Sequence, residues 1–365
     1  MRNAINGRWP MRMVRAACAV MALFAAVLAL GCANIWGPTT TSAAYTTYLY
    51  MTDTFNGHIY TYNPSTNTAS STSVLIAGGN GTTEIRFYKG IAYVANGYGG
   101  IYYFDPSATS PKAQVITGST SLDAQYFAFY SANKAYVSVA TTYPSGAVYW
   151  FNPSKPLAGL TQVASGQATG YMQEIIVGAD GMIYVADNGN AKVLRIDPLT
   201  DTVTAIISAT QTGTTGLFAG NYNSQAGVFI ANTGGSIDFI ANTESTATAV
   251  ITNSTDAPIY PGRIIQLSNG NLVATGFDPS YASHTYLVEL SGKSASVSEI
   301  KSSGTSFGSL SIAYNSSSGL LYVPSTNYKG TNKLYVFDES GDQKSYSPVS
   351  VMSSKDAIAN VAFYQ

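Results

Sequence analysis

Short apolar segments alternate with polar turns along the whole chain after residue 45. The clearest copy runs through Ile183–Asp187, Lys192–Pro198 and Thr202–Ile207, where a Tyr- and Val-rich segment is followed by a turn and two further apolar segments. Period-two alternation and enrichment in Tyr, Val and Ile indicate β-strands. Since no later stretch has sustained helical periodicity, the pattern predicts an all-β fold.

The same unit recurs along the chain. The predicted first strands of the units are 84–87, 125–128, 174–177, 216–219, 263–266, 309–312 and 360–363. The predicted second strands are 48–53, 91–96, 135–139, 182–187, 228–232, 271–275 and 320–325. Successive first strands start 41 to 51 residues apart, which is the length of four short strands with their turns. The count predicts a seven-bladed β-propeller. Six or eight blades are the alternatives, because the fifth and sixth units match the pattern weakly.

The two ends of the repeat complement each other. The first unit begins directly with its second strand at Tyr48, whereas the last segment, Ile358–Gln365, has the pattern of a first strand with nothing after it. We therefore expect the C-terminal strand to complete the N-terminal blade. Such closure leaves no unpaired blade edge.

Third strands end in Asn-Pro or Asp-Pro at 63–64, 105–106, 152–153 and 197–198. These dipeptides predict turns in which the Asx side chain accepts local N–H groups and Pro fixes φ. The segments 93–96 (Tyr-Val-Ala-Asn) and 184–187 (Tyr-Val-Ala-Asp), each leading to such a turn, resemble the YVTN and NHL-type propeller repeats. The resemblance implies the fold over almost all of the chain after residue 45. It leaves the function open, because such propellers serve as enzymes, scaffolds and receptors.

The N-terminus has the layout of a lipoprotein leader. Arg12 and Arg15 precede an apolar run, Ala16–Leu30, that is too short for a membrane span. The following Gly31-Cys32 completes a segment that resembles a bacterial lipobox. We expect residues 1–31 to be a signal peptide, 32–44 a lipidated Cys with a flexible tether, and 45–365 the propeller. In a Gram-negative host, Ala33 implies the outer membrane.

An ordinary signal peptide cleaved near Cys32 is the alternative. Cys18 lies in the leader, so the mature protein would then carry a single unpaired thiol into an oxidising compartment. This argues for the lipidated form, which would be exported and held at the cell envelope.

Charge excludes one class of partner. The leader contains four Arg, and its removal leaves 14 basic against 19 acidic residues. No basic cluster remains, so a nucleic-acid partner is not expected.

Polar residues recur where the predicted first strands begin. They are Glu84, Gln125, Glu174, Arg263, Ser309 and Asn360. First strands line the central channel of a propeller, and the family resemblance implies that ligands favour the face where these strands begin. We therefore expect an inner ring of polar side chains at the channel mouth.

Two interpretations of this ring are open. Glu84, Glu174 and Asn360 offer oxygen ligands of the kind that Ca²⁺ prefers. A cation there would polarise the carbonyl of a lactone or ester, which is similar to the metal-dependent lactonase propellers. Alternatively, the channel is merely hydrated, Arg263 pairs with Glu84 or Glu174, and Gln125 satisfies backbone groups. The absence of a dense Asp-x-Asp calcium loop favours the second interpretation.

Other polar positions have simpler explanations. An outer ring at the ends of second strands, Asp53, Asn96, Asp187 and Asn232, is typical of Asx turns with Gly nearby. The only two histidines, His58 and His284, fall in the first and sixth units, and neither has an evident carboxylate partner beside a nucleophile.

Three longer predicted loops each carry a tyrosine: Tyr143, Tyr281 and Tyr328. Loop aromatics on a rigid scaffold are candidate contacts for a protein or glycan. The alternative is chance, because Tyr occupies 27 of 365 positions.

Two functions remain. The first is a membrane-tethered, non-catalytic propeller whose loop face binds a protein, a glycan or another cell-envelope polymer, and which needs no cofactor. The alternative is a Ca²⁺-dependent, lactonase- or esterase-like hydrolase with its site at the channel mouth.

Overall fold

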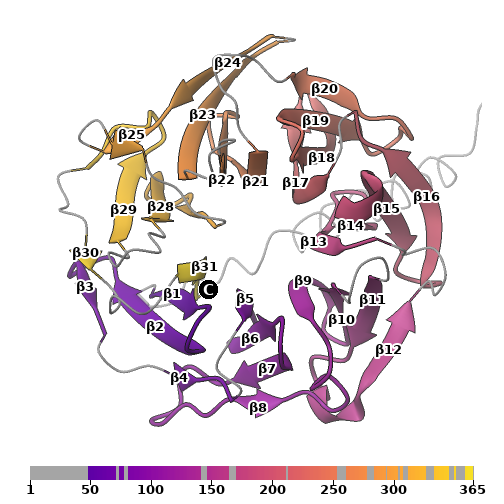
Figure 1. Ribbon diagram of the computed structural model, residues 1–365, viewed down its shortest axis with the longest axis vertical. Coiled ribbons are helices and arrows are strands. Elements are labelled where there is room, and N and C mark those ends of the chain that lie inside the picture. Colours follow the sequence, from indigo (N-terminus) through magenta and orange to yellow (C-terminus); the bar gives the residue numbers. More distant parts are fainter. Residues whose placement is uncertain are drawn as a thin grey trace, which may run out of the picture. The chain divides into compact units, whose positions relative to one another are not determined.

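A computed structural model describes most of the chain from Tyr48 onwards. The described residues are 48–70, 74–77, 81–140, 146–163, 170–210, 213–252, 260–277, 283–292, 294–302, 305–306, 311–325, 333–344, 349–350 and 358–364. They form seven antiparallel sheets that surround one axis, and a separate two-stranded hairpin (Figure 1). The protein is therefore a seven-bladed β-propeller, as the repeat predicts.

The first four blades have the following strands, in order from the innermost outwards. Blade 1 contains β31 (Ile358–Phe363), β1 (Leu49–Asp53), β2 (His58–Asn63) and β3 (Thr68–Ala69), and β4 (Val74–Leu75) also pairs with β2. Blade 2 contains β5 (Thr82–Tyr88), β6 (Ile91–Asn96), β7 (Gly100–Phe104) and β8 (Gln114–Val115). Blade 3 contains β9 (Ala124–Ser131), β10 (Lys134–Val139), β11 (Ala147–Phe151) and β12 (Leu160–Val163). Blade 4 contains β13 (Met172–Val177), β14 (Ile183–Asp187), β15 (Lys192–Asp197) and β16 (Thr202–Ser208).

The remaining blades follow the same order. Blade 5 contains β17 (Thr214–Tyr222), β18 (Gln225–Asn232), β19 (Ser236–Ala241) and β20 (Thr248–Ile251). Blade 6 contains β21 (Tyr260–Gln266), β22 (Leu272–Phe277), β23 (Ser283–Ser291) and β24 (Ser294–Glu299). The hairpin β25 (Lys301–Ser302) and β26 (Thr305–Ser306) comes next. Blade 7 contains β27 (Ala313–Asn315), β28 (Leu320–Ser325), β29 (Lys333–Asp338) and β30 (Val349–Ser350). The helical segments within the described ranges are two 3₁₀ turns, Pro156–Ala158 and Asn188–Asn190.

Closure of the ring follows the prediction from the two ends of the chain. Strand β31 pairs antiparallel with β1, with Leu49 opposite Phe363 and Met51 opposite Val361 (Figure 1). The Asn360 N–H also donates to Thr52 Oγ1 at 3.0 Å. The C-terminal strand therefore supplies the innermost strand of the N-terminal blade, which removes an exposed edge from each.

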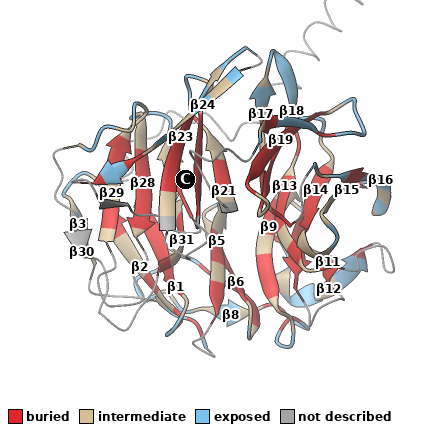
Figure 2. Ribbon diagram, turned by 45° about the horizontal axis from the view of Figure 1, so that its top comes forward, coloured by how far each residue is buried: buried red, intermediate tan, exposed pale blue. Residues whose placement is uncertain are grey.

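Apolar clusters fill the space between neighbouring blades. Tyr50 of blade 1, for example, packs with Ile85 and Val94 of blade 2, and Met51 of blade 1 packs with Tyr322 of blade 7. The second strands are buried on both faces because a blade packs on either side (Figure 2). This explains why they are near-continuous apolar runs, whereas outer strands such as β16 alternate with exposed residues.

The Asx turns after the third strands have the predicted geometry. The side-chain oxygens of Asn63, Asp105, Asn152 and Asp197 accept the N–H group two residues further on at 2.8 to 2.9 Å. Asp338 makes the same bond to Ser340 N–H at 3.0 Å, without a following Pro. These carboxylates and amides have a structural role.

One predicted first strand is displaced. The pattern predicts it at 309–312, but β27 begins at Ala313. Ser309 lies outside the described residues. Ser311, which is buried, takes the position next to the axis in blade 7.

Candidate functional site

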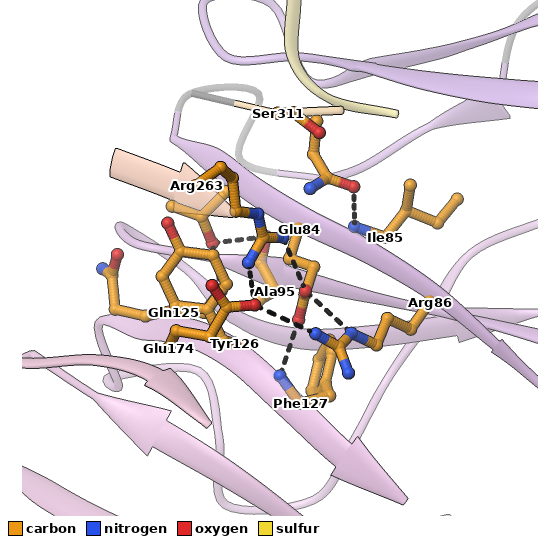
Figure 3. Close-up of polar contacts among 12 residues, drawn as sticks. Glu84, Ile85, Arg86, Ala95, Gln125, Tyr126, Phe127, Glu174, Arg263 and Ser311 are labelled. Atoms are coloured by element: carbon orange, nitrogen blue, oxygen red, sulfur yellow. Dashed lines mark hydrogen bonds and ion pairs between the residues drawn. The ribbon is translucent and has the colours of Figure 1, made fainter. Parts of the chain in front are cut away.

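Strand register identifies which side chain of each blade lies nearest the axis. Glu84 pairs with Ala95, Tyr126 with Ser138 and Arg263 with Thr275. These partners occupy equivalent places near the ends of the second strands. Glu84, Tyr126 and Arg263 are therefore equivalent, and each points toward its neighbours at the axial edge of the propeller (Figure 3).

The register corrects the predicted place of Gln125. The residue of blade 3 equivalent to Glu84 is Tyr126, so Gln125 falls one position early and faces differently. Its amide donates to Asp123 Oδ1 rather than to the carboxylates on the axis. The physical reason is the irregular start of the first strands: a register shift occurs between Thr82 and Glu84 and similar shifts occur in blades 4, 5 and 6.

Two carboxylates and two guanidinium groups meet at the axis. Arg263 Nη2 lies 3.1 Å from Glu84 Oε1, and Arg263 Nη1 bonds Glu174 Oε1 (Figure 3). Arg86 Nε lies 2.8 Å from Glu84 Oε1, and Arg86 Nη2 lies 3.3 Å from Glu174 Oε1. The Arg263 guanidinium stacks over the Tyr126 ring at 4.8 Å. We call Glu84, Arg86, Tyr126, Glu174 and Arg263 the axial network.

Sequence reasoning missed Arg86 and Tyr126. Arg86 lies two residues after Glu84 on the same strand, and side chains two apart share one face of a strand. That spacing could have identified it. Matching Ala92-Tyr93-Val94 to Ala135-Tyr136-Val137 would set Phe127 level with Glu84. Tyr126 takes that place because the pairing of β9 with β10 has a register shift between Lys134 and Ala135, which the sequence does not reveal.

The second oxygen of each axial carboxylate joins two blades. Glu84 Oε2 accepts Phe127 N–H at 2.6 Å, and Glu174 Oε2 accepts Leu217 N–H at 3.3 Å. Two neutral residues at the same position do likewise: Asn360 Oδ1 accepts Ile85 N–H at 3.2 Å, and Ser311 Oγ accepts Val361 N–H at 3.0 Å. The side chain of the axial residue in one blade thus accepts a backbone N–H from the first strand of the next blade. This hydrogen bond is a structural reason for the axial residue to be polar.

Burial sets the electrostatics of this network. Glu84 and Glu174 are almost fully buried. Burial raises the pKa of the Glu174 carboxyl, although Arg263 and Arg86 act in the opposite direction. Burial lowers the pKa of Arg263, but the carboxylates of Glu174 and Glu84 raise it more, so its pKa lies above the ordinary value. Burial also raises the pKa of the Tyr126 hydroxyl to about 12. The arginines are therefore the fixed positive charges on which the buried carboxylates depend.

The axial residues do not fit a Ca²⁺ site. All four carboxylate oxygens of Glu84 and Glu174 already accept hydrogen bonds from Arg86, Arg263 or a backbone N–H. Two guanidinium groups occupy the space between the carboxylates, and a dication there would have to displace both. Asn360 Oδ1 is bonded to Ile85 N–H. Within the described ranges, no three His, Cys, Asp or Glu side chains gather in a way that could hold a metal.

The outer ring consists of turn residues. Asp53 accepts Phe55 N–H at 2.9 Å, Asn96 accepts Tyr98 N–H at 2.8 Å, and Asp187 accepts Asn190 N–H at 3.2 Å. In blade 5, Asn232 Nδ2 donates to Asp238 Oδ2 at 2.9 Å. The bonds of Asp53, Asn96 and Asp187 to nearby backbone N–H groups are those of Asx turns and local caps, whereas Asn232 bonds a side chain of the next strand.

His284 has a carboxylate neighbour that the sequence did not suggest. Its Nδ1 lies 2.5 Å from Glu299 Oε1, and Lys301 Nζ lies 2.9 Å from Glu299 Oε2. His284 and Glu299 face each other across the outer strands β23 and β24, away from the axial network. His58 begins β2 in blade 1, so the two histidines lie in different blades.

Several predicted positions lie outside the described residues. They are the three loop tyrosines, Tyr143, Tyr281 and Tyr328, and the lipidation candidate Cys32. No helix in the described part of the chain has the length and apolar character needed to cross a membrane.

Comparison with known proteins identifies relatives by structure alone. No protein-family model matches the chain, and no curated protein matches it. Two solved structures, from Bacteroides fragilis and Bacteroides uniformis, are provisionally named as 6-phosphogluconolactonases. They are 11% and 14% identical, with TM-scores of 0.65 and 0.62, and the match covers 89% and 88% of this chain and 100% of theirs. A Lactobacillus plantarum protein is 16% identical over 87% of this chain and all of its own, with a TM-score of 0.66. What is shared is the fold. At this level of sequence identity, a shared fold does not show that this protein has the activity of the similar structures.

Proposed function

We propose that the protein is an exported, non-catalytic binding propeller. A lipid on Cys32 would hold it at the cell envelope, at the outer membrane in a Gram-negative host. The face on which first strands begin, which we call the loop face, would bind a protein or a glycan. Support for the location comes from the leader and its lipobox-like Cys32.

The closed axial network is the observation that supports a non-catalytic function. A hydrolase that used the predicted site at the channel mouth would need Glu84 or Glu174 free to move a proton or to hold a cation. Glu84 and Glu174 instead share the same two arginines, and each also bonds the backbone of the next blade. Every oxygen of these two carboxylates already accepts a hydrogen bond within the ring, which gives them a structural role.

A lactone-hydrolysing enzyme is the second candidate. The match to the full length of two proteins provisionally named as 6-phosphogluconolactonases favours it. Arg86 also keeps about a third of its side chain exposed, so it is available to an anionic substrate. Because the axial carboxylates do not fit a cation, this second candidate would have to act without Ca²⁺.

One experiment separates the two. Full-length protein, extracted in detergent, is incubated with 6-phosphogluconolactone, γ-butyrolactone and dihydrocoumarin, beside a Glu174→Gln variant. The proposal predicts that the rate of ring opening equals the spontaneous rate for both proteins. Hydrolysis by the wild type that is lost in Glu174→Gln would contradict it and establish the second candidate.

A further inference from the structure

One aromatic ring is held in place on the loop face yet is open to solvent. Tyr98, in the turn between β6 and β7, is 83% exposed. Its backbone N–H donates to Asn96 Oδ1 at 2.8 Å. A methyl group on Gly81 would collide with Tyr98 Cδ2, so the ring packs directly on the Gly81 backbone. The Gly97 N–H donates to Gly81 O at 2.7 Å and fixes the two loops to each other.

A carboxylate and an amide of blade 3 lie beside this turn. A methyl group on Gly97 would lie 2.8 Å from Asp123 Oδ1 and 3.4 Å from Gln125 Nε2. Gln125 donates to Asp123 Oδ1 and so orients the carboxylate. Asp123 is only half-buried, and Oδ1 is the oxygen that accepts this bond. The small size of Gly97 leaves room for the Asp123 side chain beside the Tyr98 turn.

Blade 4 contributes a second tyrosine. Tyr171 precedes β13 and is half-buried. Burial raises the pKa of its hydroxyl, and the nearby Asp123 and Tyr98 raise it further. Tyr171 also lies close enough to Tyr126 to affect the pKa of that residue. Contacts through Gly81 and Gly97 bring Tyr98, Asp123 and Gln125 of blades 2 and 3 together, and Tyr171 of blade 4 is near enough to Asp123 and Tyr98 to interact with them electrostatically. We call these four residues the loop-face cluster.

We propose that the loop-face cluster binds a neutral saccharide, with the Tyr98 ring stacked on a sugar face and Asp123 and Tyr171 bonded to its hydroxyl groups. An exposed, rigid aromatic ring suits the apolar C–H face of a pyranose and loses little entropy on binding. The neighbouring carboxylate, amide and phenol are donors and acceptors for adjacent hydroxyls. This inference rests on the proposed binding function and names its ligand class.

The polar surroundings of Tyr98 favour a saccharide over a protein. Protein interfaces centre on buried apolar and aromatic anchors. The exposed side chains Phe55 and Leu75 lie at the loop-face end of blade 1, outside the cluster. Leu157 and Leu199 follow the third strands of blades 3 and 4, at the opposite end of the blades. Beside Tyr98 the cluster is polar, and Asp123 is its only carboxylate.

The test uses the full-length protein in detergent. It is applied to an array of neutral hexose and N-acetylhexosamine oligosaccharides, and the strongest binder is titrated by calorimetry. Tyr98→Ala should weaken binding about tenfold, which corresponds to about 1.4 kcal/mol, whereas Tyr98→Phe keeps the ring and should bind like the wild type. Asp123→Asn should weaken binding about tenfold or more, because it removes the charged acceptor. Leu199→Ala is the matched control, with an 81% exposed side chain at the other end of the blade, and should have no effect.

Two results of the binding measurements would overturn the inference. One is the absence of binding to every saccharide on the array. The other is equal binding by Tyr98→Ala and the wild type. If a photo-reactive residue at position 98 instead cross-links an envelope protein, the saccharide inference fails and the proposed binding function stands. Lactone hydrolysis would contradict the proposed function whatever the array shows, so the two failures are distinguishable.

Discussion

Removing Arg263 tests whether the axial network holds the ring together. In Arg263→Met, Glu84 loses a partner at 3.1 Å and Glu174 loses a direct ion pair, while both side chains stay buried. The methionine retains much of the volume but has no charge. Of the two arginines in the axial network, only Arg86 then remains to neutralise the two carboxylates.

The expected loss of stability is large for a single substitution. Removing one partner of a buried ion pair costs about 3–5 kcal/mol, because a buried charge is left uncompensated. We expect the lower end, about 3 kcal/mol, since Arg86 and one backbone N–H remain for each carboxylate. Loss of the stacking on Tyr126 adds to this.

The pH dependence has a definite sign. Burial already raises the folded-state pKa of Glu174 above its unfolded value, and Arg263 lowers it. Removal of Arg263 should therefore raise this pKa further. A raised carboxyl pKa means that folding favours the protonated form. The deficit of Arg263→Met relative to the wild type should therefore shrink as the pH falls toward about 5 and grow toward about pH 8.

Urea unfolding followed by intrinsic fluorescence provides the measurement, with midpoints compared at about pH 5, 7 and 8. Arg195→Met is the matched control: Arg195 pairs with Asp180 at 2.6 Å and lies over the Tyr184 ring, but on the outer part of blade 4. Being partly exposed, this pair should contribute at most about 1 kcal/mol. Adding Glu174→Gln to Arg263→Met should recover part of the loss, because one unpaired charge disappears. Equal losses for Arg263→Met and Arg195→Met, or a deficit that does not change with pH, would refute the reasoning.

Three further predictions concern closure, titration and anchoring. Val361→Asp places a charge in the buried β31–β1 seam and should lower stability by about 3 kcal/mol or more; a wild-type urea midpoint would argue against closure by β31. Burial raises the pKa of Asp123 to about 6, so the stability that it contributes relative to Asp123→Asn is fully present below its unfolded pKa of about 4 and is lost as the pH rises through about 6; a pH-independent difference in midpoints would exclude the shift. Cys32→Ser should abolish incorporation of labelled palmitate and move the protein from the membrane to the soluble fraction, and unchanged membrane association would rule out the lipid anchor.

The fold could be predicted because its signal is local and repeated. The runs Ile91–Asn96 and Leu320–Ser325 are apolar on both faces, since each second strand is buried between blades. The predicted bounds of these two strands agree with the structure to the residue. Closure followed from the unmatched strands at the two ends, and the Asx turns followed from Asp-Pro and Asn-Pro dipeptides.

The axial site was only partly predictable, because side-chain position depends on register. A shift near the start of a first strand, as between Thr82 and Glu84, moves the residue that faces the axis by one position. The axial positions of Glu84, Glu174 and Arg263 were predicted correctly. In blade 3, however, the residue that faces the axis is Tyr126 and not Gln125. The two-residue spacing could have indicated that Arg86 pairs with Glu84, but not that Arg86 also contacts Glu174, which is 88 residues away along the chain.

The loop-face cluster escaped prediction for another reason. Tyr98, Asp123 and Tyr171 come from three blades, and the missing side chain at Gly97 leaves room for Asp123 beside the Tyr98 turn. A glycine in a hairpin turn is expected for its backbone alone, so its role in letting the next blade approach has no signature in one sequence.

The metal content of the purified protein tests the central claim most directly. We would measure bound cations by mass spectrometry before and after chelation, and thermal unfolding with and without added Ca²⁺, for the wild type and Glu174→Ala. If Arg86 and Arg263 neutralise the axial carboxylates, the wild type should hold far less than one cation per chain, and Ca²⁺ should leave its unfolding temperature unchanged. About one tightly held cation per chain that is lost in Glu174→Ala would contradict the account.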